Sequence, residues 1–294
     1  MKIVKLMGGL GNQMFQYAFA KSIGNEVLFD NSWFEWAEKK YGKTHMIYGM
    51  NLLNAKLEFA TREQIQECLE ESKLATKITN FDKVFHIKLL HSKRVYEKIR
   101  NKFEPELYNY TGNVYYDGYF QTPKYFENIK ERLISDFTPR NELSSENKKV
   151  LEDIQSSNSV AISTRRGDYV KLGYALPAEY YNSALEEIAK RVENPIFYMF
   201  SNDMEWSLKN INIDNKFKII PCESFDKNCG YVCGLYLMSK AKHNIITNST
   251  YPWWAAWLND YSNHIVIAPK GWIKTQGIVA STFADLIPEN WIKL

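Results

Sequence analysis

The sequence predicts an α/β protein of two domains, because two stretches that alternate between strands and helices flank one polar joint. The first stretch opens with a strand and a glycine-rich turn at the N-terminus, and the second begins near residue 159. A chain of 294 residues is long enough for two medium-sized domains. These observations indicate two Rossmann-like domains facing a cleft, at 1–140 and 141–294.

The N-terminal residues show the strand–turn–helix–strand order most clearly. A strand is expected at 2–7, a tight turn at 8–11, a helix at 12–23 and a second strand at 26–30. Apolar side chains recur at helical spacing in the predicted helix, and a glycine follows its end. This order favours a parallel sheet.

The rest of the first half is less regular. Thr61 and Gln64 predict a capping box that opens a helix. A strand is expected at 114–120, followed by an amphipathic helix at 122–137 with a proline near its start. The polar residues directly after this helix predict the linker between the two domains.

The second half repeats the alternation and again favours a parallel sheet. Each strand–helix spacing suits a right-handed crossover. Strands are expected at 159–164, 196–200, 216–221, 243–247 and 264–268, and helices at 177–192, 229–241 and 250–259.

Composition and charge exclude several classes of protein. The net charge of +3, without a run of Lys or Arg, argues against a nucleic-acid binder. No apolar stretch approaches the roughly 20 residues that span a membrane. The N-terminus reaches glycine too soon for a signal-peptide core, so a cytoplasmic protein is expected.

Three of the four cysteines, Cys222, Cys229 and Cys233, lie within 12 positions. Their spacing fits no zinc knuckle, and no histidine lies between them. Buried thiols are therefore favoured over a metal site.

Arg165 and Arg166 directly follow a predicted buried strand, and Gly167 and Asp168 complete a compact cationic turn. Open α/β sheets bind ligands at the carboxyl ends of their strands. The planar guanidinium matches phosphate oxygens. The turn predicts a diphosphate site, such as one for a sugar nucleotide. A surface ion pair between either arginine and Asp168 is the alternative.

The turn at 8–11 lies between a strand and a helix, where helix N–H groups can face an anion. It lacks the glycine spacing of a dinucleotide-binding loop and the lysine of a Walker loop. Asn12 and Gln13 offer amides that suit sugar hydroxyls or a phosphate oxygen. A helix cap formed by Asn12 is the alternative.

Two further strand ends carry polar residues. Asn248, Ser249 and Thr250 predict a phosphate cradle at a helix N-terminus, or a simple helix cap. Asp203 would accept N–H bonds from a guanine edge or bind a ribose, or cap the next helix through Trp206. The tryptophans that follow, Trp253, Trp254 and Trp257, are expected to be packing residues.

Five motifs occur in order along the chain, at 8–18, 118–126, 165–169, 248–256 and 269–272. They begin with Gly-Gly-Leu-Gly-Asn-Gln and include Gly-Tyr-Phe-Gln, Arg-Arg-Gly-Asp-Tyr, Asn-Ser-Thr-Tyr and a Pro-Lys-x-Trp segment. Together they resemble the bacterial α-1,2-fucosyltransferases of the inverting glycosyltransferase family 11.

The resemblance implies a GT-B-type variant with an acceptor-side first domain and a GDP-fucose-binding second domain. L-Fucose would move from GDP-β-L-fucose to the 2-hydroxyl of a terminal β-galactoside, without a cofactor or a metal. Arg165 would stabilise the departing GDP, and Asp168 is the candidate base or orienting group. The expected donor contacts are Asn12, Gln13, Arg165, Arg166, Asp203, Asn248, Ser249 and Thr250.

The implied partners are GDP-fucose and a β-galactoside-terminated glycan or lipid-linked oligosaccharide, as in O-antigen or lipopolysaccharide biosynthesis. The expectation includes peripheral membrane contact and excludes nucleic acid. No acceptor-binding residue is assigned. The 35–110 region is expected to shape the acceptor pocket, and the candidate aromatic contacts there and just before it are Trp33, Phe34, Trp36 and Tyr48.

Four positions depart from the family pattern. Ser163 replaces a histidine, Asn202 an aspartate, Gly234 an acidic residue, and Pro252 a serine. Serine cannot titrate as histidine does, which leaves the general base unassigned. The alternatives are a non-catalytic glycan- or GDP-binding relic, and a transferase of the same fold with another GDP-sugar or linkage.

Overall fold

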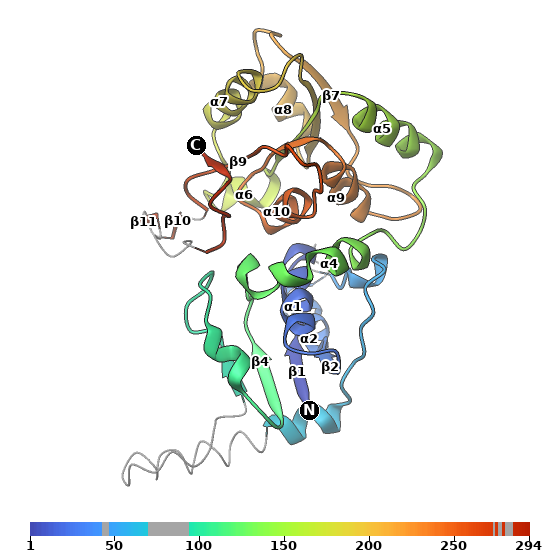
Figure 1. The fold of residues 1–294 in the computed structure, drawn as a ribbon, viewed down its shortest axis with the longest axis vertical. Helices are drawn as coiled ribbons and strands as arrows, with labels where there is room; N and C mark the ends of the chain where they lie inside the picture. The colour runs from blue at the N-terminus through green and yellow to red at the C-terminus, as the bar shows by residue number, and fades with distance from the viewer. Residues whose placement is uncertain (43–46, 70–93, 273, 276–277, 280–284) are drawn as a thin grey trace. The chain divides into compact units, whose positions relative to one another are not determined.

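The computed structural model describes residues 1–42, 47–69, 94–272, 274–275, 278–279 and 285–294 (Figure 1). The chain divides into two compact units, each with its own parallel sheet. Unit 1 comprises Met1–Met50, Ala55–Lys130 and Thr282–Leu286, and unit 2 comprises Asn51–Asn54, Glu131–Ser281 and Ile287–Leu294.

Unit 1 contains a four-stranded parallel sheet in the order β2-β1-β4-β3. The helix α1 packs against β1, and a capping box between Thr61 and Gln64 precedes another helix, as predicted. The elements are β1 (Lys2–Lys5), α1 (Leu10–Ser22), β2 (Val27–Asp30), α2 (Ser32–Tyr41), β3 (Arg94–Tyr96), β4 (Val114–Asp117) and the 3-10 helices η2 (Pro105–Asn109), η3 (Pro123–Tyr125) and η4 (Glu127–Ile129). The 3-10 helix η1 (Met50–Leu52) and the helix α4 (Lys130–Asp136) each include residues of both units.

The continuous helix expected at 122–137 is wrong, and aromatic packing gives the physical reason. Thr122 caps only a short 3-10 helix, and Phe126 leaves the helical region with a φ of −141° and a ψ of 11°. Tyr125 packs edge-on against Phe19, whereas Phe126 packs against Phe15. Burying two consecutive rings on different neighbours overrides the local helical pattern. Regular α-helix begins only at Lys130.

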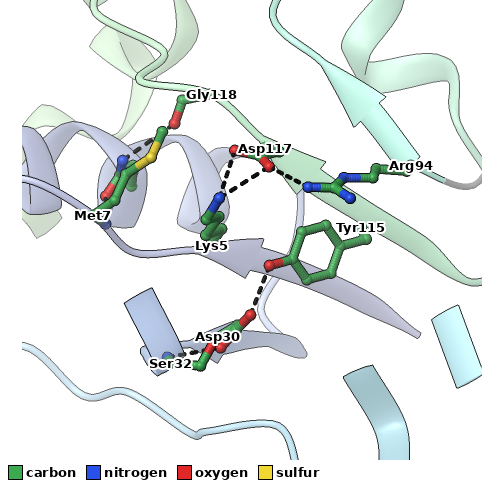
Figure 2. A network of polar contacts seen from close by, with 9 residues as sticks. Lys5, Met7, Asp30, Ser32, Arg94, Tyr115, Asp117 and Gly118 are labelled. Carbon is green, nitrogen blue, oxygen red and sulfur yellow. Dashed lines mark hydrogen bonds and ion pairs between the residues drawn. The ribbon is translucent and has the colours of Figure 1, made fainter. Parts of the chain in front are cut away.

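A network of polar contacts joins all four strands of the unit 1 sheet (Figure 2). The Asp117 carboxylate on β4 accepts from Lys5 on β1 at 3.1 Å and from Arg94 on β3 at 2.8 Å. Tyr115, also on β4, donates to the Asp30 carboxylate on β2 at 2.6 Å. Burial and the Asp30 charge raise the pKa of Tyr115 far above its ordinary value, so it stays a donor.

Unit 2 contains a six-stranded parallel sheet in the order β12-β9-β8-β5-β6-β7. In Figure 1 the adjacent helices α9 and α10 lie side by side, and α5 packs against α9. The elements are α5 (Ser145–Ser156), β5 (Ser159–Thr164), α6 (Gly167–Lys171), α7 (Ala178–Ala189), β6 (Ile196–Ser201), α8 (Met204–Asn210), β7 (Lys218–Cys222), α9 (Val232–Ser239), β8 (His243–Ile245), α10 (Thr250–Trp257), β9 (Val266–Ala268), β12 (Ile292–Lys293) and the β10–β11 pair (Lys274–Thr275, Ile278–Val279).

The predicted α/β class with parallel sheets is confirmed, and the five strands expected in the second half are present with small shifts at their ends. Helix α5 was not predicted from sequence, because its polar residues resemble a linker. Ser144 caps it by accepting from the Asn147 backbone N–H at 3.3 Å. Among the described residues, no helix combines the length and apolar character needed to cross a membrane.

The Asp117 network generates a stability prediction. Asp117→Asn leaves Lys5 and Arg94 facing a neutral acceptor, so the free energy of unfolding should fall by about 1.5–3 kcal/mol. The control is Asp136→Asn, which breaks an (i, i+4) pair with the more exposed Arg132 and should cost less than about 1 kcal/mol. Urea unfolding measures the free energy of unfolding of both variants. Equal losses would show that the Asp117 network contributes no more to stability than the Asp136 ion pair does.

Candidate functional site

The carboxyl ends of three adjacent strands in unit 2 carry the polar turns predicted from sequence. β5 lies between β6 and β8, and all three run parallel. The segments after them therefore leave the same edge of the sheet, where ligands of α/β proteins bind. Unit 2 thus brings together the predicted residues from 165–168, 203 and 248–250.

The two arginines after β5 have different supports. The Arg165 Nη2 lies 2.8 Å from the Asp168 Oδ1, and its guanidinium lies 5.3 Å from the Tyr169 ring centroid. The Arg166 guanidinium lies over Trp206, 3.6 Å from the ring centroid. The ion pair considered as an alternative is therefore formed by Arg165, whose side chain remains 31% exposed.

Neither arginine uses all its donors within the described part of the chain. The buried Nε atoms of Arg165 and Arg166 have no hydrogen-bond partner there. A buried guanidinium donor without a partner is unfavourable unless something else accepts from the group. Because the Arg165 side chain is 31% exposed, the rest of its guanidinium remains accessible to a ligand, and guanidinium donors match phosphate oxygens.

The segment after β6 holds Asp203 as a helix cap. Its carboxylate accepts from the Trp206 backbone N–H at 3.1 Å, which is the structural alternative considered from sequence. A cluster of three hydroxyls, Thr164, Ser201 and Ser207, lies beside it, with oxygen separations of 2.6–2.9 Å. The guanosine role of Asp203 stays a prediction.

The turn after β8 orders the start of α10. The Asn248 side chain donates to the Tyr174 carbonyl at 2.9 Å and accepts from the Thr247 hydroxyl at 2.9 Å. Ser249 stands at the N-cap without forming a side-chain cap, and Thr250 is the first helical residue. The Ser249 hydroxyl therefore does not cap α10, and the phosphate-binding role of Ser249 remains a prediction.

A pocket of about 490 Å³ adjoins this turn. Apolar and aromatic side chains line most of it, and Asn248 connects it with the start of α10. Its lining includes Tyr174, Leu176, Pro177, Asn248, Lys270 and Trp272. The three helical tryptophans expected to be packing residues are 0–8% exposed, which confirms that expectation.

The glycine turn lies in unit 1, where Gly8 has a φ of +77° and a Cβ there would meet the Asn12 Nδ2 at 2.6 Å. Asn12 lies within α1 and its Oδ1 accepts from Gln121 at 2.8 Å. Gln13 is fully buried; it donates to the carbonyls of Gly8 and Ile47 and accepts from a backbone N–H. These contacts show a structural role for Gln13, and donor binding by either amide stays a prediction.

The candidate acceptor aromatics are in contact with one another on and beside α2. Trp33 packs edge-on against Phe34, and Phe34 against Tyr48. Trp36 is 48% exposed, and Lys40 lies 4.7 Å from its ring centroid. Residues 43–46 and 70–93 of the predicted acceptor region lie outside the described residues.

Two departures from the family pattern have structural consequences. Ser163 is buried at the end of β5, opposite Phe200 on β6. Gly234 lies so close to the chain before α9 that a Cβ would meet the Ser224 Cα at 2.9 Å. An acidic side chain at position 234 would therefore require Ser224 to move.

Sequence reasoning missed the aromatic supports of the arginines. Tyr169 stands four residues after Arg165, and this helical spacing was an available signal. Trp206 follows a different strand from Arg166, so no spacing in the sequence connects the two residues. The same is true of Asn202, whose Oδ1 accepts from the Arg166 backbone N–H at 2.7 Å.

Asp226, Cys229 and Cys233 form a buried cluster whose ligand atoms lie within 4.8 Å of one another. Burial raises the pKa of the Cys229 thiol to about 11, with the Asp226 charge adding to the effect. Four N–H groups already donate to the Asp226 carboxylate, from Ser144, Asn147, Asn228 and Cys229. Protonated thiols and a fully bonded carboxylate suit a structural link better than a cation site.

Comparisons with known proteins give consistent results. A family model described as "Glycosyl transferase family 11" matches residues 1–294. An alpha-1,2-colitosyltransferase of Escherichia coli is 31% identical over 304 residues, covering 99% of this chain and 98% of that protein. The O-antigen biosynthesis glycosyltransferase WbnK of Escherichia coli is 26% identical over 313 residues, covering 98% and 99%. A galactoside alpha-(1,2)-fucosyltransferase 1 of Sus scrofa is 28% identical over 147 residues, covering 46% and 40%.

The Asp226 contacts predict a loss of stability in acid. Burial opposes the charge, but hydrogen bonds from Asn147, Ser144 and Asn228 outweigh it and lower the pKa of Asp226. Because the pKa of Asp226 is lower in the folded protein than the unfolded value of 3.8, the charged carboxylate stabilises the fold at pH values above 3.8. This stabilisation is lost as the pH falls through the folded pKa. Asp226→Asn should therefore cost about 1.5–3 kcal/mol at neutral pH, and less in acid.

Urea unfolding over a pH series measures this difference. The control, Asp214→Asn at an exposed position, should stay near the wild-type stability throughout. A cost of Asp226→Asn that is unchanged between neutral pH and pH ~3 would show that the carboxylate charge is not the source of the stabilisation.

Proposed function

Because the chain belongs to glycosyl transferase family 11, we propose that it is an inverting transferase that moves L-fucose from GDP-β-L-fucose to the 2-hydroxyl of a terminal β-galactoside. The motif resemblance and the α-1,2-transferases among its relatives support this reaction. A lipid-linked or cell-surface glycan is the proposed acceptor class, since a relative carries an O-antigen biosynthesis name.

One observation carries the proposal: two supported arginines lie one strand away from the N-terminus of α10. Arg165 and Arg166 follow β5, and Ser249 and Thr250 begin α10 after the neighbouring β8. Guanidinium groups and helix N–H groups both bind phosphate oxygens favourably. This pairing supports diphosphate binding by unit 2.

The proposed chemistry is a single in-line displacement. The acceptor 2-hydroxyl oxygen forms a bond to C1 of the sugar while the bond from C1 to the phosphate oxygen breaks. The bonding electrons leave with GDP, and the configuration changes from β to α. Arg165 and Arg166 stabilise the negative charge that grows on the departing diphosphate, so the reaction is proposed to need no metal.

Asp168 is better placed to orient Arg165 than to act as an unencumbered base. Its Oδ1 lies 2.8 Å from the Arg165 Nη2, so this oxygen already takes part in a charge-assisted bond. Ser163 cannot take a proton at neutral pH. We therefore propose that leaving-group stabilisation contributes more than base strength, because the transition state resembles an oxocarbenium ion.

The second candidate donor is a GDP-linked colitose. The relative with 31% identity over almost the whole chain is named a colitosyltransferase. Fucose and colitose are both 6-deoxy sugars, so the same diphosphate contacts would serve either donor. The reaction and the linkage would then be unchanged in type.

Substitution of Arg165 tests the phosphate assignment. Arg165→Ala should lower turnover with GDP-fucose by about 10²–10³-fold, the usual effect of losing a preorganised charge donor. Arg165→Lys keeps the charge but loses the fork, so it should be intermediate. The control is Arg191→Ala, an exposed residue just after the end of α7 that pairs with Glu187. Turnover of Arg165→Ala near that of wild type would reject the assignment.

A donor comparison tests the function itself. Purified protein is incubated with GDP-fucose or GDP-colitose and β-galactoside acceptors, and the product linkage is determined by NMR. An α-1,2-fucosylated product is expected at the same rate with and without EDTA. Transfer of colitose alone favours the second candidate, and GDP binding by calorimetry without any transfer indicates a non-catalytic relic.

A further inference from the structure

The loop after β6 contacts the backbone of the arginine turn directly. The Asn202 Oδ1 accepts from the Arg166 backbone N–H at 2.7 Å. Arg166 itself has φ −119° and ψ −107°, outside the common helical and extended regions. The next residue, Gly167, has a φ of +38°. A backbone in such a conformation persists only where its neighbours hold it in place.

Asn202 also limits the space around this turn. A Cβ on Gly167 would lie 2.7 Å from the Asn202 Nδ2, so the amide packs directly on the glycine. The side chain therefore restrains Arg166 by a hydrogen bond and Gly167 by contact. Both restraints act on the two residues that follow Arg165.

The segment that carries Asn202 is itself firmly held. The Ser201 hydroxyl accepts from the Asp203 backbone N–H at 2.9 Å and lies 2.6 Å from the Thr164 hydroxyl at the end of β5. Asp203 caps α8 through Trp206, and Trp206 lies under the Arg166 guanidinium. The β6–α8 segment thus supports both the backbone and the side chain of Arg166.

We propose that Asn202 is a positioning residue that holds Arg165 and Arg166 ready for the donor diphosphate. This role rests on the proposed function. Preorganised donors bind an anion without first losing conformational freedom, so the effect should fall on donor binding. In this chain an amide stands where the family pattern has an aspartate, and it accepts from Arg166 without adding a negative charge.

The test compares Asn202→Ala and Asn202→Asp with Asn158→Ala. Asn158 is a matched control, because it is exposed at the opposite end of β5 and donates to the Glu193 carbonyl at 2.7 Å. Asn202→Ala should raise the Kd for GDP and the KM for the donor by roughly 3- to 10-fold, as expected for one hydrogen bond. The acceptor KM and the Tm should stay close to wild type.

Asn202→Asp separates the effect of the hydrogen bond to Arg166 from the effect of a negative charge at residue 202. Its carboxylate can still accept from Arg166, so the turn should be retained, but the added charge should weaken GDP binding at low salt. Raising the ionic strength should bring this variant closer to wild type, because salt screens the added charge. Asn202→Ala should show no such recovery.

Gly167→Ala changes the other partner of the contact between Asn202 and Gly167. It should weaken GDP binding because its Cβ strikes Asn202 and its backbone φ is unfavourable. Combined with Asn202→Ala, its effect should be less than additive, because alanine at 202 removes the clash.

Two outcomes would overturn the role of Asn202: a GDP Kd and donor KM for Asn202→Ala equal to wild type, or an acceptor KM that rises as much as the donor KM. A wild-type chain that binds no GDP would instead contradict the proposed function, and this role with it.

Discussion

The parallel pairing of β5 with β6 on one side and β8 on the other brings three strand ends to one edge of the unit 2 sheet. Thr164, Ser201 and Ser207 close the β5–β6 side of this edge through hydroxyl contacts. Every residue of unit 2 that we connect with the donor follows one of these strand ends. A shift in strand register would separate the arginines from both of their neighbouring turns.

The guanidinium groups of Arg165 and Arg166 at this edge of the sheet are supported mainly by aromatic rings. Tyr169 and Trp206 each lie under one guanidinium, and Asp168 is the carboxylate paired with Arg165. An aromatic face attracts a cation without occupying its N–H donors. This arrangement explains how two consecutive arginines are held in place while retaining N–H donors for an anionic ligand.

Local patterns were reliable where strand order and side-chain periodicity agreed. The buried strands of unit 2 and the capping box at Thr61 were predicted because each depends on residues close in sequence. The 122–137 helix failed because Tyr125 and Phe126 pack on different partners in the folded chain. Helix α5 was overlooked because its exposed face makes it as polar as a loop.

The sequence by itself determined the α/β class, the turns after the strands and the family to which their motifs belong, because these features are encoded by neighbouring residues. Only the tertiary structure decided that Asn202 bonds the Arg166 backbone and that Trp206 supports its side chain. These partners lie some 36–40 positions away, on a different strand end. Their contact depends on strand pairing, which no local spacing specifies.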